Sequence, residues 1–411
     1  MSTSALDISA TEALGAQQLR VIIVCFVVAM VDGFDTLMLA YIAPLLSQTW
    51  DLSHGGMGKL FGIGYLGAVF GGFCMGPISD RIGRKRALIA SLLIIATFTL
   101  LGSQAGSPGE LMIYRLFAGL GLGGAIPCIT ALTAENVPAS RRTSMVTAMF
   151  LGFPIGAVVG GGITAFLLTR FDWPAIFIVG GVAAIVCILL TTFLVPASEP
   201  GAGRHAQSPF STLGKQFADG RGPATVMLWI TAFCVMTVTY FMVSWTPTVL
   251  HLTGMDLHKA DTASLSVNIG GIVGALLIAT LVGRRSPFTC AACFLLVGTL
   301  VVCAIGASLQ STALAVIAFF FAGFGVIGGQ LILPAMAARL FPASVRGAGV
   351  GALMGIGRIG SIAGPMIGGL LLSMELPWTY MYLIAAIPVA VAAMAVASAE
   401  VLRPREADEA R

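Results

Sequence analysis

The chain has 411 residues, of which 57% are hydrophobic and only 10% are charged, and its formal net charge is +4. Soluble globular proteins carry about 25% charged residues, so this chain lacks the charge needed to cover a water-facing surface. Together with a mean hydropathy of +0.96, this composition excludes a soluble fold. It predicts an all-α protein whose solvent is the lipid bilayer.

Twelve apolar stretches follow one another along the chain, each of roughly 20–28 residues, against the ~20 needed to span a bilayer. Lipid offers no partners to backbone polar groups, and the stretches are too long and continuous for barrel strands, so each one predicts a helix. The predicted transmembrane helices cover residues 20–46, 55–79, 87–106, 110–133, 143–168, 173–195, 223–250, 262–282, 288–307, 312–335, 347–373 and 378–399.

One long polar interruption, at residues 196–222, divides the chain into two predicted six-helix halves, 1–195 and 223–411. It contains charged residues and prolines and is expected to be a cytoplasmic loop.

The two halves also repeat each other in sequence. The Pro138-Ala139-Ser140 loop recurs 204 residues later as Pro342-Ala343-Ser344. At the same displacement, Gly156 and Gly160 match Gly360 and Gly364. Two six-helix halves related by a pseudo-two-fold axis along the membrane normal are a transporter architecture.

Charge placement predicts the orientation of the chain. With a cytoplasmic N-terminus, 17 of the 22 Lys and Arg residues fall on the cytoplasmic side, as the positive-inside rule requires. We therefore expect both termini in the cytoplasm of a bacterium and the helices in its inner membrane, and we expect no nucleic-acid partner. The cytoplasmic set is Arg20, Arg81, Arg84, Lys85, Arg86, Arg141, Arg142, Arg204, Lys215, Arg221, Arg284, Arg285, Arg339, Arg346, Arg403, Arg405 and Arg411.

Two acidic residues, Asp32 and Asp35, lie near the middle of the first predicted helix, whereas the other sixteen are in loops, tails or helix ends. A charge at the bilayer centre costs about 2.5–3.5 kcal/mol on insertion scales, which makes such a residue a functional candidate. Their i, i+3 spacing puts both carboxylates on one helix face, where two like charges with little water disfavour double ionisation. The pattern predicts proton coupling or substrate binding. The alternative is a structural pair satisfied by neighbouring helices.

Two arginines also lie inside predicted helices. Arg358 is near the middle of the eleventh helix, where no acid in its own helix can neutralise it. A buried guanidinium requires an anion, and its fork of donors suits a carboxylate, which here is Asp32, Asp35 or a substrate. Arg115 lies one and a half turns into the fourth helix, and either binds an anion, snorkels outward or forms a structural pair.

Uncharged polar residues in the predicted helices are candidates for lining a substrate cavity, each with an interhelical hydrogen bond as the alternative. Trp245 and Phe241 would stack on an aromatic ring if they line that cavity, and otherwise belong to the packing. The polar candidates are Tyr41, Tyr65, Tyr240, Asn268 and Gln330.

Enzyme and cofactor motifs find no support in this sequence. Gly119-x-Gly121-x-x-Gly124 matches the dinucleotide fingerprint literally, but it lies inside a transmembrane segment and follows no strand. Such glycines are interpreted as close-packing surfaces between helices. No zinc-protease or Ser-His-Asp pattern is present, so we expect no catalysis, no metal and no cofactor.

The loop after the second predicted helix resembles the signature of the major facilitator superfamily. Gly76-Pro77-Ile78-Ser79-Asp80-Arg81-Ile82-Gly83-Arg84-Lys85-Arg86 follows the pattern G-x-x-x-D-R-x-G-R-[KR]. The resemblance implies rocker-switch alternating access, in which Asp80 engages a helix end of the other half and helps to hold the cytoplasmic side closed. The gating residues that it implies are Gly76, Asp80, Arg81, Gly83, Arg84, Glu135, Arg142 and Arg346.

The first helix narrows the resemblance to the aromatic acid:proton symporter family. Asp32-Gly33-Phe34-Asp35-Thr36, followed by Ala43-Pro44, is similar to that family's pattern, as are Arg115-x-x-x-Gly119 and Gly357-Arg358-Ile359-Gly360. The resemblance covers nearly the whole chain. It implies import of small aromatic carboxylates such as 4-hydroxybenzoate, benzoate or protocatechuate, and relatives with similar motifs carry muconate or nicotinate.

This resemblance implies a mechanism. The carboxylate binds midway through the membrane between the halves, Arg358 and Arg115 bind the anion, and Asp32 and Asp35 hold the co-transported proton. The expected partners are the aromatic acid, protons and the bilayer, and a monomer is expected to function. Asn at either Asp is expected to abolish uphill uptake while the protein stays in the membrane.

Two other functions remain open. Gly152-Phe153-Pro154-Ile155-Gly156 resembles an antiporter motif and favours efflux by proton antiport. A transporter-like receptor that binds aromatic acids and signals is the other.

Overall fold

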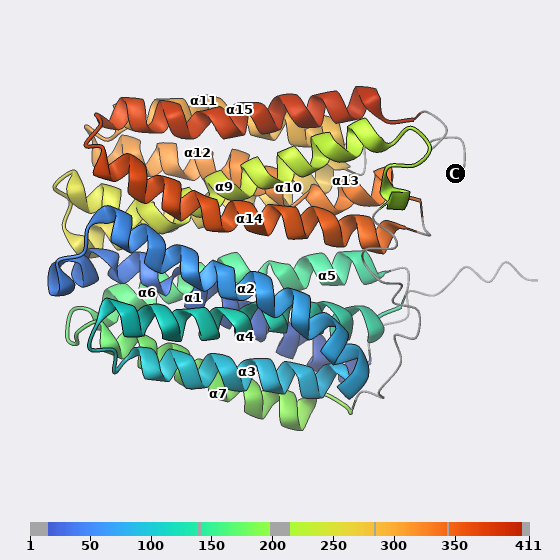
Figure 1. The fold of residues 1–411 in the computed structure, drawn as a ribbon, viewed down its shortest axis with the longest axis horizontal. Coiled ribbons are helices and arrows are strands. Elements are labelled where there is room, and N and C mark those ends of the chain that lie inside the picture. The colour runs from blue at the N-terminus through green and yellow to red at the C-terminus, as the bar shows by residue number, and fades with distance from the viewer. Residues whose placement is uncertain (1–14, 139–140, 198–213, 283–284, 343–344, 405–411) are drawn as a thin grey trace, which may run out of the picture.

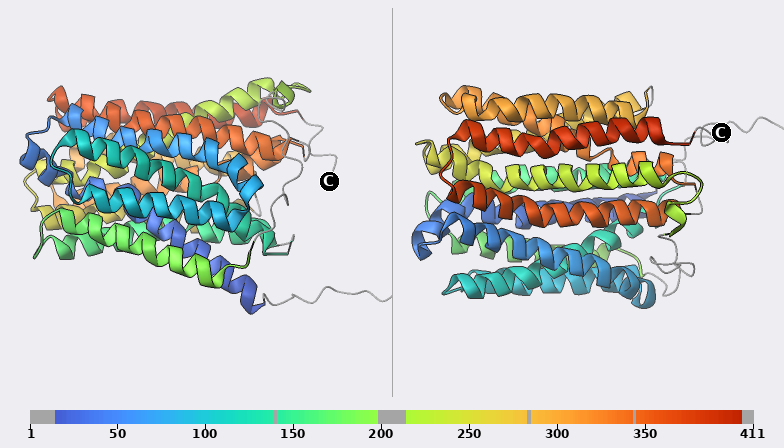
Figure 2. Two further views of the ribbon diagram at one scale, coloured as in Figure 1. Left: turned by 60° about the horizontal axis from the view of Figure 1, so that its bottom comes forward. Right: turned by 45° about the horizontal axis from the view of Figure 1, so that its top comes forward.

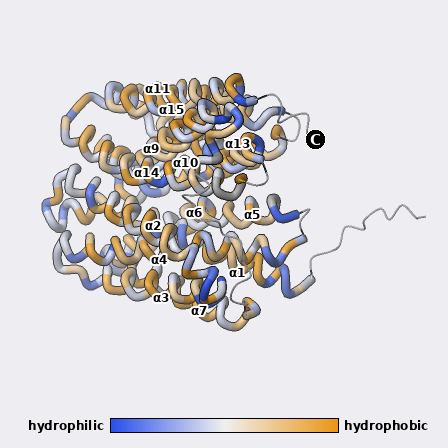
Figure 3. Tube along the Cα trace, turned by 45° about the vertical axis from the view of Figure 1, so that its right-hand side comes forward, coloured by the Kyte–Doolittle hydropathy of each residue, from blue (hydrophilic) through white to orange (hydrophobic). Residues whose placement is uncertain are grey.

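The computed structural model describes residues 15–138, 141–197, 214–282, 285–342 and 345–404. Within these ranges it contains helices and connecting segments without a strand, and twelve helical spans are long and apolar enough to cross a membrane. Hydrophobic residues dominate along these spans (Figure 3). The predicted all-α, twelve-helix fold is therefore confirmed.

The helices begin and end within a few residues of the predicted stretches. The longest extend past them by up to one turn because polar residues are tolerated at helix ends near water. The six spans of the first half are α1 (Ala16–Trp50), α2 (His54–Ile82), α3 (Arg84–Gly102), α4 (Pro108–Glu135), α5 with α6 (Arg142–Phe150 and Gly152–Leu167) and α7 (Pro174–Leu194). Those of the second half are α9 (Gly222–Leu252), α10 (Leu257–Val282), α11 (Pro287–Ser308), α12 with α13 (Thr312–Gln330 and Leu333–Leu340), α14 (Arg346–Ser373) and α15 (Trp378–Leu402). A short 3₁₀ helix, η2 (Gly214–Gln216), precedes α9. Much of the predicted central loop and the Ala-Ser parts of the repeated Pro-Ala-Ser loops lie outside the described residues.

Prolines explain why two spans are each built from two helices. A proline has no N–H to give to the carbonyl four residues earlier. Pro154 withholds this bond from Phe150, where α5 ends, and Pro334 withholds it from Gln330, where α12 ends. The interruption falls in the fifth span of the first half and in the fourth span of the second half, so it is not part of the internal repeat.

The halves are built to one packing plan. In the first half, α1 packs on α6, α2 on α4, and α3 on both α4 and α7. In the second half, the corresponding pairs α9 with α14, α10 with α12, α11 with α12 and α11 with α15 are in contact. The two bundles lie one above the other in Figure 1 and in the right-hand view of Figure 2. Between the halves, α2 contacts α14 and α10 contacts α6. These two contacts are equivalent, because α10 is the counterpart of α2 and α14 is the counterpart of α6.

The molecule has two ends along its helices. The terminal face is the one on which α1 begins and α15 ends, and the opposite face carries the α1–α2 and α9–α10 connections. Three aromatic pairs and a hydrogen bond join the halves, and they involve residues 54–65 of α2 and 240–245 of α9. These segments are the parts of α2 and α9 nearer the opposite face. The halves are therefore in contact on that face.

Glycines let α2 and α4 pack backbone to backbone. A side chain at Gly119 of α4 would collide with the carbonyl oxygen of Gly64 in α2, and one at Gly67 would collide with the carbonyl oxygen of Leu116. This contact confirms that the literal dinucleotide fingerprint around Gly119 is a helix-packing surface. Small residues at such positions allow the close approach that drives helix association in lipid.

Gly119→Ala is expected to destabilise the protein by about 1–3 kcal/mol, because its methyl group forces α2 and α4 apart. Gly162 of α6 is the matched control, since a side chain there meets no atom within 4 Å. Gly162→Ala is expected to be neutral or to raise stability by about 0.5–1 kcal/mol, the usual difference between Gly and Ala inside a helix. Thermal unfolding of the purified proteins in detergent measures both, and equal melting temperatures for the two variants would contradict the packing described.

Candidate functional site

A buried ion pair lies between α1 and α4. Nη1 of Arg115 is 2.7 Å from Oδ1 of Asp35, and Nη2 donates to the backbone oxygen of Asp35 at 3.0 Å. Oδ2 of Asp35 accepts a 2.7 Å hydrogen bond from Thr99 on α3. Asp35 is 0% and Arg115 is 3% exposed. Of the possibilities that the sequence left open for Arg115, pairing is confirmed and outward snorkelling is wrong.

Removing one partner of this pair is expected to damage the fold. Asp35→Asn leaves the Arg115 guanidinium buried and unneutralised, and breaking a buried pair in this way costs about 3–5 kcal/mol. The double variant Asp35→Asn, Arg115→Gln removes both charges together and is expected to recover most of that loss. Denaturation of the purified variants tests this coupling. Additive effects of the two substitutions would contradict it.

Asp32 and Arg358 stand apart from that pair. Asp32 of α1 is 8% exposed, and Arg358 of α14 is half-buried. Neither side chain forms an ion pair or hydrogen bond with any described residue, yet the two lie close enough for the Arg358 charge to act on the Asp32 carboxyl. The two aspartates on the same helix therefore have different surroundings. Asp35 is held by three partner groups, whereas Asp32 is free to bind a proton or a ligand.

Two tyrosines meet beside Asp32, one from each half. The rings of Tyr65 on α2 and Tyr240 on α9 pack edge to face with centroids 4.7 Å apart. The Tyr65 hydroxyl lies 3.5 Å from the hydroxyl of Ser244. Both tyrosines interact electrostatically with Asp32, and Tyr240 also with Arg358. An acid (Asp32), a cation (Arg358) and the two tyrosine rings therefore lie together where the two halves face each other.

The other predicted cavity residues divide into two groups. Tyr41 and Trp245 are buried, and each donates a hydrogen bond to a backbone oxygen. The Tyr41 hydroxyl donates to Ala157 at 3.0 Å, and the Trp245 ring N–H donates to Pro365 at 2.9 Å. They are packing residues in this conformation. The buried amide oxygen of Gln330 has no hydrogen-bond partner among the described residues, and Asn268 is buried; both stay candidates for lining a cavity.

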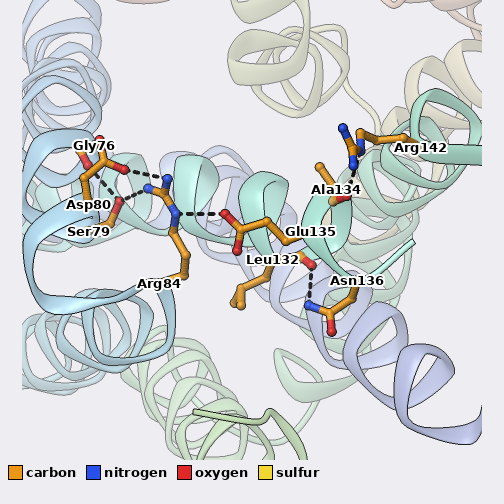
Figure 4. A network of polar contacts seen from close by, with 9 residues as sticks. All are labelled: Gly76, Ser79, Asp80, Arg84, Leu132, Ala134, Glu135, Asn136 and Arg142. Carbon is orange, nitrogen blue, oxygen red and sulfur yellow. Dashed lines mark hydrogen bonds and ion pairs between the residues drawn. The ribbon is translucent and has the colours of Figure 1, made fainter. Parts of the chain in front are cut away.

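A second polar cluster lies on the terminal face (Figure 4). Arg84 at the start of α3 pairs with Asp80 at 2.5 Å and with Glu135 at 3.4 Å, and donates to the hydroxyl of Ser79 at 2.6 Å. Arg142 donates to the backbone oxygen of Ala134 at 2.8 Å. All of these contacts lie within the first half. Engagement of the second half by Asp80 stays a prediction for a different conformation.

The remaining gating residues are placed as follows. Gly83 has φ +93°, a backbone conformation that L side chains rarely adopt, and it lies between the end of α2 and the start of α3. Gly76 is on α2 and accepts a hydrogen bond from Ser79, and Arg81 is exposed. Arg346 begins α14, but its side chain lies outside the described residues.

Three polar residues were not singled out from the sequence, namely Thr99 and Ser244, which contact residues of this site, and Asp261, which is buried elsewhere in α10. Thr99 and Ser244 are hydroxyl residues in apolar helices, a weak signal because such hydroxyls commonly bond to their own helix. Asp261 is 0% exposed although it was assigned to a helix end, because the predicted eighth helix started at residue 262 and α10 starts at Leu257. Among the described residues, no group of three His, Cys, Asp or Glu side chains is placed to hold a metal ion.

Comparison with known proteins identifies the family. A family model described as Major Facilitator Superfamily matches residues 25–333 and 281–411. The chain is 32% identical to a gallate transporter of Pseudomonas putida, over 93% of this chain and 92% of that protein. It is also 32% identical to the 4-hydroxybenzoate transporter PcaK of Acinetobacter baylyi, over 93% of this chain and 91% of that protein.

Solved structures agree on the fold. A bacterial homolog of the human lysosomal transporter Spinster, in an inward-facing and occupied conformation, superposes with a TM-score of 0.77 at 14% identity, over 95% of this chain and 97% of that one. A D-xylose-proton symporter gives 0.75 at 17% identity, over 94% of this chain and 98% of that one. The matching family model and the two relatives show that the chain is a multi-pass membrane protein of the major facilitator superfamily and belongs to its aromatic acid transporters.

Proposed function

We propose that this protein imports small aromatic carboxylates together with a proton, by alternating access of a central site between its two halves. The observation that carries the proposal is the pair Asp32 and Arg358, an acid and a cation from opposite halves without ionic partners among the described residues. A guanidinium in that position suits a carboxylate, for which it offers two parallel donors. Tyr65 and Tyr240 beside it offer aromatic edges and faces to a ring.

The roles of the four charged residues then differ. Arg358 binds the substrate carboxylate and Asp32 carries the proton. Arg115 and Asp35 neutralise each other and hold α1, α3 and α4 in register, so they position Asp32 on the same helix without contacting the substrate. This assignment separates Asp32 from Asp35, both of which the sequence suggested as proton carriers, and it takes Arg115 out of substrate binding.

Carrying a proton together with the substrate removes the opposition of the membrane potential to anion entry. A monoanion entering against an inside-negative potential is opposed by about 2.3 kcal/mol per charge per 100 mV. One proton carried with one monoanion makes the transported charge zero, so the membrane potential no longer opposes entry. The pH gradient then drives accumulation.

We place the terminal face in the cytoplasm. The positive-inside rule supports this orientation, because Arg81 at the end of α2, Arg84 at the start of α3 and Arg142 at the start of α5 lie on that face. Since the halves contact each other on the opposite face, the conformation described corresponds to the state that is closed to the outside. The cluster of Arg84, Asp80 and Glu135 would exchange partners with the second half when the cytoplasmic side closes.

The test is uptake into sealed proteoliposomes with an inside-alkaline pH gradient. The panel contains radiolabelled 4-hydroxybenzoate, gallate, protocatechuate, benzoate, muconate and nicotinate. Accumulation of an aromatic acid above that in protein-free liposomes, collapsed by a protonophore, is expected, and it would name the substrate. Accumulation only when the gradient is reversed would establish efflux by antiport instead, and binding without counterflow would indicate a receptor.

A further inference from the structure

Asp261 is a buried acid that the transport mechanism above does not use. It is 0% exposed, and neither of its carboxylate oxygens has a hydrogen-bond partner among the described residues. An ionised carboxylate buried without partners is costly, whereas a protonated one loses far less on leaving water. Its burial therefore favours the neutral acid in this conformation.

The position of Asp261 ties it to the contact between the halves. It lies in the first turns of α10, near the opposite face, and α10 contacts α6 of the first half. Leu265 is one helical turn further along, on the same side of α10, and it reaches the space beside Gly161 of α6 and the ring of Tyr41 on α1. The Asp261 carboxyl itself interacts electrostatically with Tyr41. It therefore faces the first half at the point where the opposite face is closed.

Among the side chains that the structure describes, no cation neutralises Asp261, and Lys259, two residues earlier on α10, is exposed. The hydroxyl of Tyr41 faces it from α1, and the acid Asp256 acts on it from the preceding turn. On α9, which also packs against α10, the titratable groups are Cys234, Tyr240 and His251, and the ring Nδ1 of His251 is engaged with the backbone oxygen of Met255 at 3.1 Å. The helices α6 and α12 contain no titratable residue, and α11 contributes only cysteines.

We propose that Asp261 is a second proton-binding site, reached from the opposite face, whose protonation permits that face to close. When α10 separates from α1 and α6, water reaches the carboxyl and it ionises. Closure then requires that a proton return to it. The sign follows from linkage: the closed form binds one more proton than the open form, so a rise in pH shifts the population toward the form open on the opposite face.

This proposal rests on alternating access, the geometric part of the proposed function, but its test needs neither a substrate nor a gradient. Hydrogen–deuterium exchange of amides 257–265 is followed in the full-length protein in nanodiscs from pH 5 to 9, corrected for the pH dependence of intrinsic exchange. In the wild type, exchange is expected to rise by about tenfold per pH unit over part of this range, the slope of one coupled proton. A failed uptake panel would leave this result intact, and the reverse also holds.

The variants decide whether Asp261 is the responsible group. Asp261→Asn keeps the shape of the neutral acid and is expected to stay protected at every pH, whereas Asp261→Glu retains the pH dependence. Asp51→Asn, at an exposed acid on the same face, is expected to behave as the wild type. Protection independent of pH in the wild type, or an unchanged pH dependence in Asp261→Asn, would overturn the proposal.

Discussion

Asp32→Asn is expected to abolish uphill accumulation of the aromatic acid while leaving its exchange across the membrane intact. The amide keeps the size of the side chain but cannot release or bind a proton between pH 5 and 9. Because Asp32 has no ionic partner among the described residues, its neutralisation breaks no salt bridge and the fold is preserved. Radiolabel uptake under an inside-alkaline gradient and counterflow at equal pH measure the two activities separately.

The comparison with other acids makes this prediction specific. Asp51→Asn, at the exposed end of α1, is expected to accumulate substrate as the wild type does. Asp35→Asn is expected to lose activity together with stability, because it breaks the pair with Arg115. Normal accumulation by a well-folded Asp32→Asn variant would remove Asp32 from the role of proton carrier.

Arg358→Gln is expected to weaken substrate binding by about 10–100-fold, which corresponds to losing a charge-assisted hydrogen bond of about 1.5–3 kcal/mol. Arg358→Lys keeps the charge but loses the planar fork that matches a carboxylate, so it is expected to recover only part of the affinity. Equilibrium binding of the labelled acid to purified protein measures both variants.

A matched control separates local chemistry from total charge. Arg170, on the opposite face, is exposed and lies over the ring of Phe166. Arg170→Gln is expected to leave the affinity unchanged, because no substrate reaches it in the proposed path. An affinity of Arg358→Gln equal to that of Arg170→Gln would show that the carboxylate binds elsewhere.

The fold was predictable because its determinants are long and local. Twelve apolar stretches and the repeated glycines specify twelve spans in two equivalent bundles, and these features need no knowledge of tertiary contacts. Helix ends were less predictable. The first turn of α10 contains polar residues, a composition typical of a loop, so Asp261 was assigned to a helix end. In the structure it lies inside α10 and is buried.

The division of labour in the site was not predictable from sequence. The i, i+3 spacing of Asp32 and Asp35 puts both acids on one face, but the neighbours that distinguish them come from distant segments. Thr99 and Arg115 are 64 and 80 residues from Asp35 along the chain. Only their three-dimensional placement shows that Asp35 is satisfied and that Asp32 is not.

Proton movement coupled to substrate entry tests the central claim most directly. Proteoliposomes carrying a trapped pH indicator, with the membrane potential clamped and no pH gradient imposed, receive the substrate identified by the uptake panel. Protein-free liposomes correct for passive entry of the neutral acid. The wild type is expected to acidify the vesicle interior in parallel with substrate entry, whereas Asp32→Asn is expected to admit substrate without acidification. Substrate entry into wild-type vesicles with no pH change, or with internal alkalinisation, would contradict the central claim.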